Sequence, residues 1–360
     1  MYSTGEKMQV IVEITGEQLK EIEQIIRSGK CPSIETFIQL SIANQIYIEK
    51  KSQKGAKLLS PTTPLITREK KEIVLGREYS QDTRLFSLTK VPSENIKIVD
   101  QSDQKLDNFP FWGQNNRLFC IKPILRSLSR LLASRNSNWI EYDEFCREAI
   151  IDALQLQNIL EKDDEKQGRA RGLTFATSLP TNDAKSMSRF QLQYIGYVRP
   201  KDGKLTGLLP MLRFINIKKN EKTGTMMIGI TKEGLEFTQI DSPIIDQFVA
   251  QGKTVTQPLS TEEVNYLLKH ISKYCSHEYN FMSDFLQAVD KGTVTPTSLL
   301  DHVRTYFHTN YKRDFTEAVI GTMRAGMTGR LLEMGLLSLQ KEGLKSSYKL
   351  TDSGKKYSHL

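Results

Sequence analysis

The stretch FTEAVIGTMRAGMTGRLLEMGLLSLQKEGLKSSYKLTDSG, residues 315–354, is the most informative part of the sequence about the fold. Apolar residues at helical spacing predict a helix over residues 315–334, with Gly326 and Gly329 as candidate break points. Two strand-like runs follow around the turn KEGLKSS, and the second run ends in Leu-Thr-x-x-Gly. The stretch therefore predicts a helix that leads into a β-hairpin.

A similar arrangement is found near the middle of the chain. The runs LLPMLRFINIKK (residues 208–219) and TMMIGITKEG (residues 225–234) predict two strands around a glycine turn, followed by the start of a helix. We interpret the two arrangements as a weak internal repeat of helices followed by a hairpin, over roughly residues 120–240 and 259–360. Further helices are expected over residues 121–134, 144–158, 261–275, 282–289 and 297–308 and after Lys185, and a charged loop over residues 161–172.

The N-terminal 45 residues have a different pattern. MQVIVEI (residues 8–14) alternates like a strand, and helical spacing follows over residues 16–28. The segment SGKCPS breaks that helix, and a second apolar stripe then begins at Ile34. Residues 52–108 are poor in apolar clusters and rich in polar residues, which is typical of a linker or a partly ordered connector. The sequence thus predicts a mainly α protein with small β elements.

The strand VIVEIT, the turn and the two helices resemble a ribbon-helix-helix domain, here over residues 1–51. The resemblance implies an obligate homodimer in which two chains pair their strands, and that ribbon can enter the DNA major groove. It implies dimer contacts by Val10, Val12, Ile14, Phe37, Ile38 and Ile42, and a DNA contact by Gln9. Residues 1–60 hold eight basic and seven acidic residues, so dimerisation alone and DNA reading stay open as alternatives.

The two repeats resemble winged-helix domains, at residues 109–245 and 246–360. The resemblance implies that a recognition helix lies in the major groove and that the hairpin, or wing, contacts the DNA backbone or the minor groove. In the second domain it implies DNA contacts by Arg324, Thr328 and Arg330 and wing contacts by Lys341, Lys345 and Lys349. In the first it implies contacts by Lys185, Ser186, Ser188, Arg189, Gln191 and Gln193, with Lys218, Lys219 and Lys222 on the wing.

Composition narrows the classes of function. The 360 residues carry a net charge of +8, and ten basic against six acidic residues place +4 in residues 301–360. That excess favours a polyanionic partner. The four cysteines form no CxxC pair, and the sequence offers no catalytic set, metal site or cofactor motif. No apolar run is long enough to span a membrane, and no signal peptide is recognisable, so a cytoplasmic protein is expected.

The sequence therefore favours a dimeric, non-enzymatic protein that binds duplex DNA, such as a transcriptional regulator. The alternative is a DNA-targeting or adaptor subunit of a phage-defence or restriction-type complex, which would partner a separate nuclease or helicase. The length of 360 residues favours the larger assembly slightly, because a simple regulator rarely needs two winged units.

Overall fold

The computed structural model describes residues 88–358, except 102–104, 171, 313 and 344, together with four helical positions at 16, 19, 20 and 23. The chain forms two compact units, residues 1–62 and 63–360. The strand and dimer contacts expected for the N-terminal domain lie outside the described residues; they are Gln9, Val10, Val12, Ile14, Phe37, Ile38 and Ile42.

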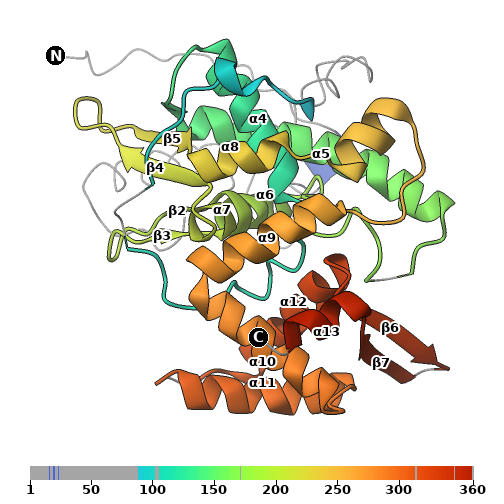
Figure 1. Ribbon diagram of the computed structural model, residues 1–360. Coiled ribbons are helices and arrows are strands. Elements are labelled where there is room, and N and C mark those ends of the chain that lie inside the picture. The colour runs from blue at the N-terminus through green and yellow to red at the C-terminus, as the bar shows by residue number, and fades with distance from the viewer. Residues whose placement is uncertain are drawn as a thin grey trace. The chain divides into compact units, whose positions relative to one another are not determined.

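The described part of the chain is mainly helical and carries three small antiparallel sheets, which confirms the predicted class (Figure 1). The helices up to residue 249 are η2 (Ser93–Asn95), α4 (Ile121–Ser134), α5 (Tyr142–Lys166), α6 (Ala184–Phe190), η3 (Gln191–Ile195), α7 (Leu208–Met211), α8 (Lys232–Gln239) and η4 (Pro243–Val249). The helices that follow are α9 (Thr261–Tyr274), α10 (Ser276–Asp290), α11 (Pro296–Asn310), α12 (Glu317–Glu333) and α13 (Asp352–Ser358).

The strands form hairpins and one three-stranded sheet. They are β1 (Ile140–Glu141), β2 (Tyr197–Val198), β3 (Leu205–Thr206), β4 (Ile215–Lys219), β5 (Met226–Ile230), β6 (Leu337–Glu342) and β7 (Lys345–Leu350). The three-stranded sheet has the order β1-β5-β4, whereas β2–β3 and β6–β7 are two-stranded. In Figure 1 the β4–β5 and β6–β7 hairpins lie at opposite sides of the view.

The junction after each long hairpin is built in the same way. Thr231 donates its hydroxyl to the Arg213 carbonyl at 2.7 Å, and its hydroxyl oxygen accepts the Gly234 N–H at 3.2 Å. Near the C-terminus Thr351 plays the same part. It donates its hydroxyl to the Gly335 carbonyl at 2.6 Å, and its hydroxyl oxygen accepts the Gly354 N–H at 3.0 Å. The Thr-x-x-Gly ending, preceded by Ile230 in one place and Leu350 in the other, thus closes the hairpin and caps the next helix in both repeats. We call residues 121–239 the first repeat and residues 276–358 the second repeat.

The segment before the second helix contacts the hairpin in each repeat, as the short strand β1 in the first and through one backbone hydrogen bond in the second. In the first repeat Ile140 of β1 pairs with Ile228, which precedes the junction threonine by three residues. In the second repeat the Val294 carbonyl accepts the N–H of Tyr348 at 2.9 Å, and Tyr348 also precedes its threonine by three residues. The order is therefore α4, β1, α5, α6–η3, the small hairpin β2–β3, α7, the long hairpin β4–β5 and α8 in the first repeat, and α10, α11, α12, β6–β7 and α13 in the second. The first repeat thus has a small hairpin and a short helix that the second repeat lacks.

The buried side chains of both repeats form one continuous hydrophobic cluster. The cluster includes Leu88 and Ile96 from the expected connector, and the Val99 N–H donates to the Ile230 carbonyl at 2.8 Å. The end of that connector therefore packs on the first repeat. None of the described helices has both the length and the apolar character required to cross a membrane.

Several expected boundaries differ in the structure. Residues 208–211, expected to begin a strand, form helix α7, where the Met211 N–H donates to the Gly207 carbonyl at 3.1 Å, and strand β4 begins only at Ile215. Helix α10 begins at Ser276, earlier than the expected residue 282. Helix α5 continues to Lys166, so part of the expected charged loop is helical. Its acidic residues are stabilised there because Arg169 lies 2.6 Å from Asp163 and 2.9 Å from Asp164. Helix α12 runs without a break at either glycine. Because a Cβ on Gly326 would collide with the backbone of Gly113, this glycine permits a close approach of two segments rather than a break.

Candidate nucleic-acid interface

The β4–β5 hairpin exposes the lysines that the sequence assigned to the first wing. Lys218, Lys219 and Lys222 are all exposed at or near its turn. The Lys218 ammonium lies 4.2 Å from the centre of the Trp139 ring, an arrangement that attracts the cation and limits the motion of the side chain. The contact fixes one positive charge on the outer face of the sheet. Its partners are far apart in the chain, so sequence spacing gave no sign of it.

The α6–η3 segment presents a second basic surface. The Asp183 carboxylate caps α6 by accepting the Ser186 N–H at 2.9 Å. Lys185 and Arg189 are exposed, one helical turn apart, and no ion pair among the described residues involves either of them. Ser186, Ser188, Gln191 and Gln193, the other expected contacts, are half-buried. The segment therefore offers two available cations beside hydrogen-bonding side chains.

The β6–β7 hairpin also carries exposed lysines. The register pairs Ser338 with Lys349 and Glu342 with Lys345, which places both lysines on the polar face of the hairpin. Lys341 lies on the opposite face, near the turn, because side chains alternate along a strand. All three lysines are exposed, and no ion pair within the described residues includes them. Together they make both faces of the hairpin end positive.

The structure corrects the expected recognition helix of the second repeat. Arg330 is only 1% exposed, and its Nε donates to Glu278 at 2.8 Å. Thr328 is also buried, and its hydroxyl donates to the Arg324 carbonyl at 2.9 Å. Arg324 itself is half-buried. The prediction that Arg330 and Thr328 face DNA is wrong, because a buried ion pair and an intrahelical hydrogen bond occupy their polar groups.

Residues 111–119 cover the face of α12 that carries Arg330. The Phe111 N–H donates to Glu278 at 2.9 Å, and Arg330 donates to the Asn115 carbonyl at 2.8 Å. Glu333 accepts the N–H groups of Leu118 and Phe119. The segment that leads into the first repeat therefore supplies the partners of the second repeat's helix and joins α12 to the chain before α4.

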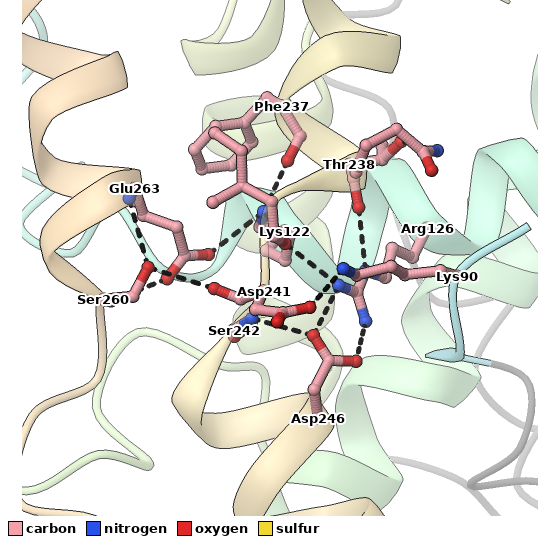
Figure 2. A network of polar contacts seen from close by, with 12 residues as sticks. Lys90, Lys122, Arg126, Phe237, Thr238, Asp241, Ser242, Asp246, Ser260 and Glu263 are labelled. Atoms are coloured by element: carbon pink, nitrogen blue, oxygen red, sulfur yellow. Dashed lines mark hydrogen bonds and ion pairs between the residues drawn. The ribbon is translucent and has the colours of Figure 1, made fainter.

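A second network of buried polar contacts involves Lys122 and Arg126 of α4, as Figure 2 shows. Lys122 lies 3.1 Å from Glu263 and donates to the carbonyls of Phe237 and Ile240. Arg126 makes a two-pronged ion pair with Asp246, at 2.5 and 2.7 Å. The two cations bind carbonyls at the C-terminal end of α8, where the helix dipole favours positive charge. Burial lowers the pKa of Lys122 to about 8, against the opposing effect of Glu263. These charges hold helices together and are not available to a polyanion.

The charged groups around residue 169 also bind other groups within the protein. Arg169 lies over the Phe175 ring, with its guanidinium carbon 3.9 Å from the ring centre, in addition to its ion pairs. Asp164 accepts the N–H groups of Phe175 and Ala176 at 2.8 and 2.9 Å. A groove of about 650 Å³ lies beside this loop, and Arg117, Arg169 and Glu333 are among its lining residues. Both arginines already have protein partners, so the groove is a weak candidate for an anion site.

The α6 helix and the two long hairpins thus carry exposed basic side chains, whereas Lys122 and Arg126 of α4 and Arg330 of α12 are buried. No protein-family model matches the chain, and no curated protein or solved structure is significantly similar to it. The geometry of the described residues is therefore the basis for a functional proposal.

Proposed function

We propose that this chain is a dimeric, non-enzymatic protein that binds duplex DNA through α6–η3 and through the two long hairpins. The observation that carries the proposal is the contrast between two groups of cations. Lys122, Arg126 and Arg330 are buried in ion pairs, whereas Lys185, Arg189 and the hairpin lysines are exposed. Exposed cations without a carboxylate partner can release counterions from DNA phosphates, which is the main source of affinity.

The order of elements supports a winged-helix architecture for both repeats. The first repeat has α4, the short strand β1, α5 and α6–η3, followed by β2–β3 and α7 before its long hairpin, and the second repeat has α10, α11 and α12 directly before its hairpin. In this architecture the third helix is the recognition helix, which is α6–η3 in the first repeat and α12 in the second. Only α6–η3 presents exposed basic side chains, so the proposal assigns the major-groove contact to the first repeat and backbone contacts to both hairpins.

A second candidate is a DNA-targeting or adaptor subunit that acts with a separate nuclease or helicase. The buried face of α12 favours this second candidate. The second repeat has an exposed hairpin, but Thr328 and Arg330 of its third helix are buried and not available to DNA. Such a repeat contributes a backbone contact without reading sequence. Co-purification with an enzyme encoded beside this gene, and DNA binding only in its presence, would favour this candidate over a regulator.

The proposal is tested by fluorescence anisotropy with a labelled 30-base-pair duplex at about 50 mM salt, where nonspecific phosphate contacts are strong. We expect Lys185→Ala with Arg189→Ala to weaken binding about tenfold and to lower the salt slope by about 2. Lys253→Ala with Lys291→Ala is the matched control, because both lysines are exposed and lie outside the proposed surface. Absence of wild-type binding, or equal losses in the two double variants, contradicts the proposal.

A further inference from the structure

One apolar side chain interrupts the basic surface of α6–η3. Leu192 is 37% exposed, one of four large hydrophobic side chains exposed among the described residues. It follows Lys185 and Arg189 at seven and three residues, and α6 continues into η3 without a change from helical backbone. The three side chains therefore lie along one stripe of a single helix. Phe190 and Tyr194 are buried on the other side.

The end of this helix is held firmly, so Leu192 is presented in a defined position. The Gly196 N–H donates to the Gln191 carbonyl at 2.9 Å, five residues back, which closes a π-type turn around Leu192. Tyr142 donates its hydroxyl to the Gly196 carbonyl. Gly207 lies so close to Gly196 that a Cβ on Gly207 would collide with its backbone. Binding to a leucine on a fixed turn costs less conformational entropy than binding to one on a loose loop, because the backbone around it is already ordered.

The charges beside Leu192 indicate the kind of partner that this surface binds. Lys185 and Arg189 favour a polyanion along this stripe. In duplex DNA the major groove offers one apolar group on a base edge, the C5-methyl of thymine. We propose that Leu192 packs on thymine methyl groups while the two cations hold the flanking backbone or base edges, which makes the helix prefer A·T-containing sites. This inference rests on the proposed function, since it names the feature of DNA that the same helix reads.

The test compares two duplexes that differ only in this methyl group. Alternating d(AT) and d(AU) duplexes of 30 base pairs are bound to the full chain at about 50 mM salt, with anisotropy as the readout. One buried methyl changes affinity roughly fourfold, so we expect the wild type to bind the thymine duplex about four- to fifteenfold more tightly. For Leu192→Ala we expect a ratio within about twofold of unity.

Leu173→Ala is the matched control, because Leu173 is exposed to a similar degree, at 44%, and lies outside α6–η3. It should keep the wild-type ratio, and equal melting temperatures would show that all three proteins are folded. Tight binding of both duplexes with equal affinity by the wild type, or an unchanged ratio in Leu192→Ala, overturns the inference and leaves DNA binding intact. Failure of the wild type to bind either duplex overturns the proposed function itself.

Discussion

Arg330 of α12 and Glu278 of α10 form an ion pair at 2.8 Å, and both side chains are almost completely buried. The pair lies where residues 111–119 of the chain meet the second repeat, because Phe111 donates to the same carboxylate and Asn115 accepts from the same guanidinium. Burial raises the pKa of Glu278, and Arg330 opposes that effect. The arginine is therefore a structural residue of the junction between the repeats.

Arg330→Met is expected to destabilise the protein by about 3–5 kcal/mol, because Glu278 would be left as an uncompensated buried charge. Urea unfolding followed by circular dichroism measures the loss. Arg324→Met is the control: Arg324 is half-buried on the same helix and has no ion pair among the described residues. Adding Glu278→Gln to Arg330→Met should restore part of the stability. Equal effects of the two single arginine variants contradict the structural role of Arg330.

Gly326→Ala is expected to lower the melting temperature, because its Cβ would collide with the backbone of Gly113 and push α12 away from the segment of residues 111–119. Gly321→Ala, five residues earlier in the second turn of the same helix, is the matched control. Nothing lies within 4 Å of a Cβ there, so it should raise stability by up to about 1 kcal/mol through helix propensity. Differential scanning calorimetry compares the two, and opposite signs are the expected result.

Glu333 should make stability depend on pH. Burial raises the pKa of this carboxyl from 4.5 to about 7, although Arg117 and the N–H groups of Leu118 and Phe119 favour the charged form. The folded protein therefore holds a proton that the unfolded chain has lost between about pH 4.5 and 7. The contribution of Glu333 to the free energy of unfolding is complete below about pH 4.5 and is lost as the pH rises to about 7. The total loss is on the order of 3 kcal/mol.

Glu333→Gln removes the titration, because the glutamine side chain does not ionise. Glutamine keeps one acceptor oxygen, so it loses one of the two hydrogen bonds that Leu118 and Phe119 donate to separate oxygens of Glu333, and that loss does not depend on pH. The wild type should lose stability relative to the variant as the pH rises from about 5 to 7. Unfolding free energies at several pH values measure the difference. Parallel pH profiles of the two proteins would contradict the assignment to Glu333.

Deletion of residues 1–50 is expected to convert the dimer into a monomer, as the resemblance to a ribbon-helix-helix domain implies. Multi-angle light scattering gives the molar mass. DNA affinity should fall by about tenfold or more, because two linked sites gain from effective concentration. Val12→Glu should have the same effect in the full chain, whereas Gln9→Ala, on the other face of the expected strand, should leave the dimer intact. A dimer that survives the deletion contradicts the assignment.

Hydrophobic periodicity determined most of the secondary structure of this protein. The apolar stripes of helices and the alternation of strands are local properties, so the helix over residues 121–134, the two long hairpins and the Thr-x-x-Gly junctions could be predicted. The exposed wing lysines Lys218 and Lys349 were predictable for the same reason, because a residue on the polar face of a terminal hairpin meets solvent. Leu192 was overlooked, although its seven-residue spacing from Lys185 was visible in the sequence.

The sequence by itself thus determined a chain of helices with two hairpins and the positions of its positive charges. Only the tertiary structure decided which charges remain available, because that depends on partners far away in the chain. Arg330 and Arg126 have the same chemistry as Arg189, yet Glu278 and Asp246 neutralise the first two in the interior. Arg189 meets no carboxylate among the described residues and remains exposed. Pairing over long sequence distances is not encoded in any local pattern. Of the two segments expected to contact DNA, it leaves the cations of α6–η3 exposed and buries Arg330 of α12.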